Sequence, residues 1–574
     1  MVPLMLALAL TAGCAGGGRA LPAGPPGSAA PTGTTRGPAR FMIVVPKATS
    51  SAASSRRSPR YVSPATQSIA VAITTDPGGT SVVNETAGLT PTSNGCSSTL
   101  ASTICTLSIA LGPGSYNAAI STYDGASGTG NELSQGQLVD FTIAEGEANA
   151  ITLTLSGIPA ALKVAGETQA VQGSQGVGFT LQGAAAQKFI VEALDPDGNI
   201  IVGPGAPTFT AALASGSGFA IANPASTTPN TLILTPPTTS GQNEIFTLTA
   251  AYGDSTCSVS GAVCTTSFSV TSHLQTLFVA NNGGSTVSVY APPYSGAHTS
   301  VSNGVGNPDA LALNAAGDLF VANNNGTVGT VTEYAPPYTG APAVTISSAD
   351  PNFSPIALAM TSGGDLMIAD NVDNAVTEYV PPYSGAATTT ITANLNSPSA
   401  LVVNSAGNLF VMNQGSNNVK EYASPYTGSP TTISGGLNDP QQMAIASSGE
   451  LFLSNGNSTL AAFTPPYSGS AATNSQDLDA PAGLAADVYG DVFVASEFSN
   501  AVLEYAAPYT GAPIANITNS VNAPRSVTLD DAGNLFVANE GNFTVTEYAP
   551  PYTGSPTVNI STGITDPVVV LLSP

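Results

Sequence analysis

The stretch VTEYAPPYTG occupies residues 331–340 and returns unchanged at 545–554, with VTEYVPPYSG at 376–385 between them. Its Pro–Tyr corner recurs along the last 300 residues, at Tyr294, Tyr338, Tyr383, Tyr426, Tyr467, Tyr509 and Tyr552. Successive tyrosines are 44, 45, 43, 41, 42 and 43 residues apart. A repeat of this regularity indicates one structural unit that is built seven times.

One unit contains four strand-like segments, which are DALALN (309–314), LFVANN (319–324), TVTEYAP (330–336) and PAVTISS (342–348). Repeats of about 40–45 residues made of four short strands are typical of β-propellers, with one blade for each repeat. PPYTG then makes the turn from the third to the outermost strand, with Gly supplying φ > 0 and Tyr covering the blade edge. A ring of tyrosines could also stack on sugars, but a corner required by geometry recurs without any ligand.

The two ends of the repeat region are out of phase. The region begins with a second strand, TLFVANN at 276–282, and finishes with a first strand, PVVVLL at 567–572. We therefore predict that residues 273–574 form a seven-bladed β-propeller in which the C-terminus supplies the inner strand of blade one. This exchange closes the ring and hides both of the sheet edges that would otherwise be left where its two ends meet.

The composition favours an all-β protein. Only 8% of the residues are charged, there is no Trp, and Gly (60) and Pro (45) are abundant. Residues 1–60 hold seven of the 11 Lys and Arg and none of the 35 Asp and Glu, so the remainder carries 4 − 35 = −31. A body this acidic repels a phosphate backbone, and we expect no nucleic-acid partner.

The repeat region resembles the NHL and YncE-like propellers, including the virginiamycin B lyase-like branch, through its post-proline strand, AGNLFVAN hairpin and VTEY strand. The resemblance implies a fold rather than an activity. Lyases of this style rely on histidine, and neither His273 nor His298 falls at a matching position. Lactonase-like propellers hold a metal through carboxylates, for which Asp309, Asp439 and Asp566 would be the counterparts. Their positions relative to the strand proline differ, so we expect no metal and no cofactor.

The N-terminus, MVPLMLALALTAGCAGGG, resembles a bacterial lipoprotein signal that ends at Cys14. No basic residue precedes the apolar run, and Thr11 replaces the usual Leu; a plain secretory signal or a free cysteine are the alternatives. We expect residues 1–14 to be the signal peptide and Cys14 the lipidated residue. Residues 15–65 should be a disordered basic Pro/Gly/Ser linker, in which FMIVVP (41–46) is the one piece able to pair with a later strand. The protein would be exported and anchored by lipid to a bacterial cell envelope or surface.

Residues 66–157 and 158–272 alternate as strands do and predict two β-sandwich domains. The second resembles bacterial immunoglobulin-like domains through a strand, the turn DPDGN (195–199) and a further strand. Asp195, Asp197 and Asn199 suit a calcium loop, but no distal acid follows, and a tight hairpin fits equally. Two close cysteine pairs predict the disulfides Cys96–Cys105 and Cys257–Cys264.

A polar residue closes each second strand, and Asn or Asp there serves by default as a local cap. If a ligand binds centrally, these residues and the acids of the following loops would form its rim. This predicted rim is Asn281, Asn323, Asp370, Asp373, Asn413, Asn455, Glu497, Asn539 and Glu540. The loops that follow the second strands vary most among the repeats, and their acids favour a cation, an amine or a basic protein patch.

Three hypotheses about function follow. The first is a non-catalytic, monomeric binding or adhesion protein of the cell surface, with a protein or glycan ligand. The second is a propeller enzyme of lyase or lactonase type, which the shortage of histidine disfavours. The third is a structural protein of the envelope.

Overall fold

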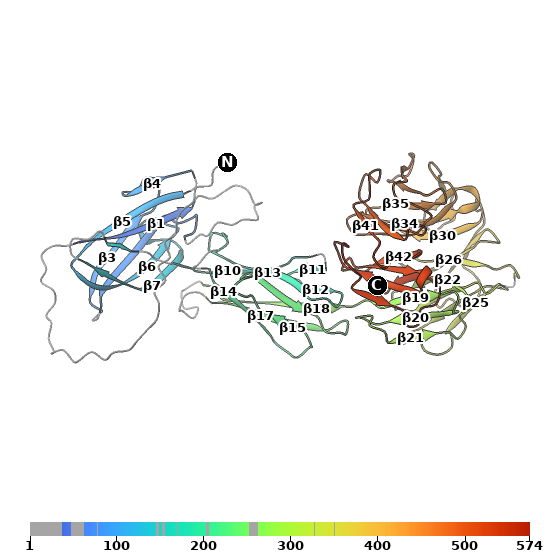
Figure 1. Ribbon diagram of the computed structural model, residues 1–574, viewed down its shortest axis with the longest axis horizontal. Helices are drawn as coiled ribbons and strands as arrows, with labels where there is room; N and C mark the ends of the chain where they lie inside the picture. Colours follow the sequence, from blue (N-terminus) through green and yellow to red (C-terminus); the bar gives the residue numbers. More distant parts are fainter. Residues whose placement is uncertain are drawn as a thin grey trace. The chain divides into compact units, whose positions relative to one another are not determined.

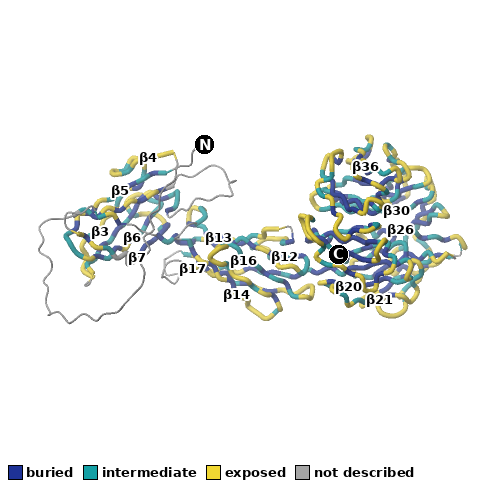
Figure 2. The backbone as a smooth tube through the Cα atoms, viewed as in Figure 1, coloured by how far each residue is buried: buried dark blue, intermediate teal, exposed yellow. Residues whose placement is uncertain are grey.

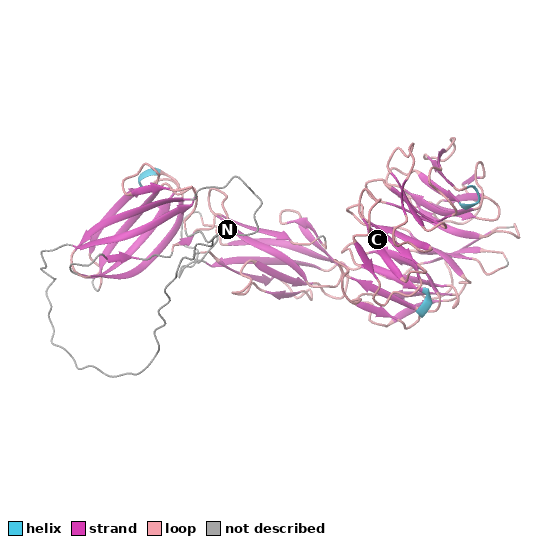
Figure 3. Ribbon diagram, turned by 45° about the horizontal axis from the view of Figure 1, so that its top comes forward, coloured by secondary structure: helices cyan, strands magenta, loops and turns pink. Residues whose placement is uncertain are grey.

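The computed structural model describes residues 37–46, 62–76, 79–100, 102–144, 149–151, 155–168, 170–201, 206–251, 262–326, 328–348 and 350–574. Within these ranges the protein is all-β, and its only helices are the short 3-10 turns η1 (Ala126–Gly128), η2 (Gln414–Ser416) and η3 (Glu540–Asn542), as Figure 3 shows. No helix in the described ranges is long and apolar enough to cross a membrane. The chain divides into two compact units: unit 1 is Met1–Ala160, Leu194–Pro207 and Tyr252–Ala262, and unit 2 is Ala161–Ala193, Thr208–Ala251 and Val263–Pro574.

Unit 1 contains two packed sheets. The first has the order β4 (Cys96–Ser98), β5 (Ser102–Leu111), β1 (Gly37–Pro46), β8 (Asn149–Ile151). The second has the order β3 (Ser81–Gly88), β2 (Ser68–Thr75), β6 (Gly114–Tyr123), β7 (Glu132–Ile143), β9 (Ser156–Gly157). Apolar residues on the inner faces of both sheets, such as Phe41 and Ile69, form one core.

Strand β1 corrects the prediction that residues 15–65 are entirely a disordered linker. β1 lies inside its sheet, antiparallel to β5 and parallel to β8. Its alternate residues Ala39, Phe41, Ile43 and Val45 are buried, whereas Met42 and Val44 are exposed. This period-two apolar face outweighs the Pro/Gly/Ser composition on either side. Residues 1–36, with Cys14, and 47–61 lie outside the described residues.

The structure shows one of the two predicted disulfides and a hydrogen-bonded turn at Asp195, where calcium was considered. Cys96 and Cys105 face each other on β4 and β5 and form the predicted disulfide. The pair Cys257–Cys264 lies partly outside the described residues, because 252–261 are not described. The Asp195 carboxylate accepts the backbone N–H groups of residues 197 and 199 at 3.0 and 2.8 Å, as a hairpin turn requires.

The first part of unit 2 is a second pair of sheets. One has the order β10 (Ala161–Gly166), β13 (Gln187–Leu194), β16 (Thr231–Thr235), β15 (Ala220–Ala222). The other has the order β11 (Val171–Ser174), β12 (Gly178–Gln182), β18 (Thr265–His273), β17 (Asn243–Ala251), β14 (Thr208–Leu213). Phe189 of the first sheet packs edge-to-face on Phe179 of the second, with ring centroids 5.1 Å apart.

From Leu277 onward the chain forms seven four-stranded sheets, here called the seven-sheet region (Figure 1). Sheet 1 comprises β46 (Pro567–Leu572), β19 (Leu277–Asn281), β20 (Thr286–Tyr290) and β21 (His298–Val301). Sheet 2 comprises β22 (Pro308–Leu313), β23 (Leu319–Asn323), β24 (Thr330–Tyr334) and β25 (Val344–Ser347). Sheet 3 comprises β26 (Pro355–Met360), β27 (Leu366–Asp370), β28 (Ala375–Tyr379) and β29 (Thr389–Ile391).

Sheets 4 to 7 repeat the pattern. Sheet 4 comprises β30 (Pro398–Val403), β31 (Leu409–Asn413), β32 (Asn418–Tyr422) and β33 (Thr431–Ile433). Sheet 5 comprises β34 (Pro440–Ile445), β35 (Leu451–Asn455), β36 (Thr459–Phe463) and β37 (Ala472–Asn474). Sheet 6 comprises β38 (Pro481–Ala486), β39 (Val492–Ser496), β40 (Ala501–Tyr505) and β41 (Ala515–Ile517). Sheet 7 comprises β42 (Pro524–Leu529), β43 (Leu535–Asn539), β44 (Thr544–Tyr548) and β45 (Val558–Ile560).

The C-terminal strand completes sheet 1, as the offset phase of the repeats predicts. β46 pairs antiparallel with β19, Leu572 opposite Leu277 and Val570 opposite Val279, and Figure 1 places the C-terminus beside β19. The first strands of neighbouring sheets contact one another in turn from β22 to β46, and β46 contacts β22. This closed series of four-stranded sheets is consistent with propeller blades.

The second strand of each sheet is buried along its whole length, as its apolar sequence predicts. Figure 2 shows much of the backbone inside the seven-sheet region in dark blue, the colour of buried residues. A tight turn leads into it. In sheet 2 the Asn314 side chain accepts the N–H groups of Ala316 and Asp318, and Gly317 supplies a left-handed φ of 85°. A side chain at this φ would be strained, which explains why Gly recurs in the AGD and AGN turns.

The Pro–Tyr corner differs from its prediction in two respects. The X–Pro bond before the tyrosine is cis in all seven corners, and the tyrosine itself has a positive φ in each, for example 63° at Tyr338. The corner glycine has a positive φ only at Gly296, Gly340 and Gly385. The tyrosine also does not cover an outer edge. The Tyr552 ring packs edge-to-face on Phe493 of the preceding sheet at 5.1 Å, and its hydroxyl donates to the Gly533 carbonyl at 2.7 Å. The corner recurs because it joins each sheet to the one before it.

Candidate functional site

The residues that close the second strands lie inside the framework. Asn281 is fully buried: its Oδ1 accepts the backbone N–H of Thr565 at 3.0 Å, and its Nδ2 donates to the Ser288 hydroxyl at 3.0 Å. The same position ties its strand to the preceding loop in the other sheets, through Asn323, Asp370, Asn413, Asn455, Ser496 and Asn539. These side chains are caps, and the prediction that they form a ligand rim is wrong for them because they are buried.

A cavity of about 560 Å³ lies at the first strands, and all seven of these strands contribute to its wall. In each strand the contributing residue directly follows the strand proline. These seven residues are Asp309, Ile356, Ser399, Gln441, Ala482, Arg525 and Val568. Because neighbouring first strands are adjacent in space, the wall encircles the centre of the seven-sheet region.

A β-bulge explains why the residue after the proline faces this cavity. In sheet 2, Pro308 pairs with Asn323 and Ala310 with Ala322, which leaves Asp309 without a partner in the ladder. The same register shift falls at this position in five of the other sheets, and in sheet 6 the ladder skips both Ala482 and Gly483. A bulge breaks the alternation of a strand and redirects one side chain, here toward the cavity.

The loops after the second strands supply the rest of the wall. The residue one position beyond the cap lines the cavity in five sheets, at Asn282, Gln414, Gly456, Glu497 and Glu540. Glu497 and Glu540 therefore belong to the predicted rim and lie at the cavity. The exposed Asp373 does not line it. The prediction chose the residue that closes each second strand, but the residue that lines the cavity is the next one along the chain. Side chains alternate along a strand, so the closing residue points between sheets and its successor faces the cavity.

Four carboxylates, those of Asp309, Glu497, Glu540 and Asp566, line the cavity beside one cation. The Arg525 guanidinium lies 3.7 Å from the Glu497 carboxylate and 3.8 Å from the Glu540 carboxylate. Burial raises the pKa of Asp309, although a hydrogen bond from Asn324, the Arg525 charge and a hydrogen bond from Asn282 oppose the shift. With every group ionised, the wall carries an excess of negative charge.

Two polar atoms of the cavity residues are buried without a hydrogen bond to any described residue. They are Ser399 Oγ and Glu540 Oε2. Buried polar atoms are seldom left unpaired, because such an atom costs about 1–3 kcal/mol of stability. Glu540 Oε2 lies 3.8 Å from Arg525 Nε, so of the two only Ser399 Oγ lacks both a hydrogen bond and an ion pair among the described residues.

The other candidate residues from the sequence, Asp439, His273 and His298, do not line this cavity. Asp439 accepts a hydrogen bond from Gln414 Nε2 at 3.0 Å. His298 lies on the outermost strand β21 and packs on Tyr290, with ring centroids 5.3 Å apart, while His273 lies 3.7 Å from Asp531. Over the described ranges, no group of three or more His, Cys, Asp or Glu residues is placed to hold a metal ion.

Comparisons with known proteins give a likeness of structure only. No family model matches the chain, and no curated protein matches it. A virginiamycin B lyase from Staphylococcus aureus is 11% identical, with a TM-score of 0.37 over 46% of this chain and 84% of that chain. A protein from Lactobacillus plantarum is 15% identical, with a TM-score of 0.45 over 52% of this chain and 99% of that chain. The structural neighbours thus include virginiamycin B lyase-like propellers, at low identity and partial coverage.

Proposed function

We propose that this chain is an exported, lipid-anchored binding protein of a bacterial cell envelope. Its seven sheets are the blades of an NHL-like β-propeller, and immunoglobulin-like domains precede them. The lipoprotein-type N-terminus and the disulfide between Cys96 and Cys105 support export. The closed series of first strands and the two pairs of packed sheets support the domain assignment.

The observation that carries the binding role is the central cavity. Its wall takes one residue from each repeat, and these seven residues are all different, whereas the caps and corners around them recur. Positions that differ among the repeats are not fixed by the shared fold, so they can be adapted to contact a ligand. Four carboxylates against one guanidinium favour a ligand that carries amines, either a small polyamine or the basic segment of a partner protein.

Calorimetric titration of the full chain with spermidine at low ionic strength tests the binding role. We expect saturable binding that 0.5 M salt weakens, because the attraction is electrostatic. The double variant Glu497→Gln, Glu540→Gln should bind at least tenfold more weakly. Asp373→Asn, which removes an exposed charge that does not line the cavity, is the matched control and should bind as the parent does.

Two outcomes would remove the proposal. Spermidine that does not bind, or that binds equally to the parent and the double variant, would exclude this cavity as an amine site. If a glycan or an anionic ligand binds instead, and Arg525→Gln weakens that binding, the cavity is not a site for amines.

An enzyme of lyase or lactonase type is the second candidate. The raised pKa of Asp309, in the same cavity as the unpaired Ser399 hydroxyl, is the observation that favours it. A raised pKa keeps a carboxyl group protonated to a higher pH than usual, which favours a role as general acid. Ring opening of a lactone by the full chain that Asp309→Asn abolishes would support catalysis. Absence of both binding and turnover would leave the structural envelope role.

A further inference from the structure

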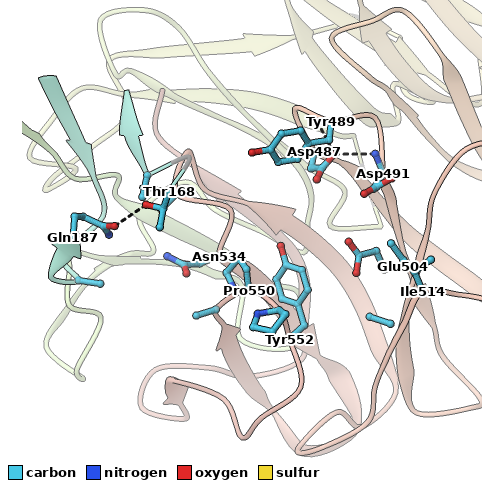
Figure 4. A pocket seen from close by; sticks show the side chains of 16 residues that line it. Thr168, Gln187, Asp487, Tyr489, Asp491, Glu504, Ile514, Asn534, Pro550 and Tyr552 are labelled. Carbon is cyan, nitrogen blue, oxygen red and sulfur yellow. Dashed lines mark hydrogen bonds between the residues drawn. The ribbon is translucent and has the colours of Figure 1, made fainter. Parts of the chain in front are cut away.

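A second cavity, of about 610 Å³, lies at the turns that join first to second strands (Figure 4). The turn of sheet 6 contributes Asp487, Tyr489 and Asp491, and Glu504 of β40 and Ile514 follow from the same sheet. Tyr552, from the corner of sheet 7, completes this part of the wall. Thr168 and Gln187, which are hydrogen-bonded at 3.0 Å, line it from the sandwich part of unit 2.

Two residues of this wall depart from the repeat. Tyr489 occupies the turn position at which the other turns have Ala316, Gly363, Ala406, Ser448 and Ala532. The backbone N–H of Ile514 donates to the Glu504 carbonyl. In three other sheets the residue that makes this hydrogen bond is smaller: Ala343, Thr388 or Thr557. Both side chains remain exposed, Tyr489 to 72% and Ile514 to 60%. The framework of the other sheets forms without large apolar groups here, so the fold does not require them.

Glu504 points into the cavity from between these groups (Figure 4). The glutamates at its position in other repeats, Glu333, Glu378, Glu421 and Glu547, are half-buried, and Glu421 accepts a hydrogen bond from Asn408 at 2.8 Å. Glu504 is only 9% exposed, and no hydrogen bond from a described residue reaches its carboxylate. A carboxylate at this depth is stabilised by a counter-charge, and no residue in the described ranges forms an ion pair with Glu504.

We propose that this cavity binds an organic cation, an ammonium or guanidinium group carried on an apolar stem. The cation lies against the Glu504 carboxylate, with Asp487 and Asp491 nearby. The stem packs against Ile514 and the rings of Tyr489 and Tyr552. An aromatic face beside a carboxylate attracts a cation through both charge and the ring quadrupole. The source is either a free amine or a basic side chain of a peptide, and the two share this chemistry.

Hexylammonium is the probe that tests the cavity, with hexanol as the neutral and hexanoate as the anionic analogue. By calorimetry on the full chain, hexylammonium should bind at least tenfold more tightly than hexanol, and hexanoate should not bind. A peptide with one internal lysine and capped ends distinguishes a side-chain source from a free amine. No preference for hexylammonium over hexanol would overturn the proposal.

Variants locate the site. Glu504→Gln keeps the volume and removes the charge, and should weaken hexylammonium at least tenfold. Glu378→Gln, the same position in sheet 3, is the matched control and should bind normally. Tyr489→Ala restores the residue found in three of the other five turns and should weaken binding severalfold even where Glu504→Gln folds poorly. Unchanged binding by either Glu504→Gln or Tyr489→Ala contradicts the assignment.

The two cavities are separable in the same experiment. The double variant Glu497→Gln, Glu540→Gln should retain hexylammonium, and Glu504→Gln should retain spermidine. Failure of the spermidine test therefore leaves this inference standing, and the reverse also holds.

Discussion

Deleting residues 566–574 removes the strand that joins the two ends of the seven-sheet region. β46 buries Val570 and Leu572 against Leu277 and Phe536. Burying an aliphatic side chain is worth about 1.5–3 kcal/mol, so this pair contributes about 4 kcal/mol. The ladder with β19 adds about four backbone hydrogen bonds at about 1 kcal/mol each. The sum, about 8 kcal/mol, is comparable with the whole stability of a typical domain.

Calorimetric melting of the full chain and of the truncated chain checks this expectation. The transition of the seven-sheet region should disappear or fall by tens of degrees, while the transition of unit 1 remains. Deletion of the exposed Pro574 alone is the control and should change nothing. Leu572→Ala is a graded version and should cost about 2–4 kcal/mol. A truncated chain that melts like the full one would refute the idea that β46 holds the region closed.

Four further predictions follow from individual residues. Tyr509→Phe should cost about 1 kcal/mol in chemical denaturation, because it removes the bond to the Gly490 carbonyl, and Tyr509→Ala should cost about 3–5 kcal/mol. Asn539→Ala should cost about 2–3 kcal/mol, because the fully buried Asn539 side chain accepts the Asn522 N–H and donates to the buried Thr546 hydroxyl; an unchanged denaturation midpoint would contradict this. Burial, with the charges of Asp491 and Asp487, raises the pKa of Glu504 to about 7, so the folded state holds this proton more tightly than the unfolded state. Stability should therefore fall by up to about 3 kcal/mol as pH rises from about 4.5 to 7, and Glu504→Gln should flatten this slope in melts across that range. Cys14→Ala should release the protein from membranes, and continued fractionation with membranes would disprove the lipid anchor.

The regular parts of the structure could be predicted from the sequence because they repeat. The tyrosine spacing gave the unit, the apolar second strands gave its most buried element, and the offset of TLFVANN and PVVVLL gave the pairing of β19 with β46. Each of these signals is periodic, and backbone geometry alone translates it into structure.

The site was less predictable because it depends on departures from the period. The bulge after each strand proline turns Asp309 or Arg525 toward the cavity, and no alternation pattern reveals a bulge. The Asn caps were misplaced onto a rim because a polar residue at a strand end looks alike whether it faces solvent or a neighbouring loop. Tyr489 was not singled out from the sequence, because the turns look nearly constant, and only the structure brings it to the same cavity as Glu504.

The seven bulged positions give this protein a form of evolvability. Each lies outside the ladder of its strand, so its side chain can change without altering a cap, a corner or a buried second strand. Mutation can then explore new cavity chemistries one repeat at a time at little cost in stability. The same property makes the chain a scaffold for engineered receptors, in which a library randomised only after the strand prolines would vary specificity while the fold stays constant.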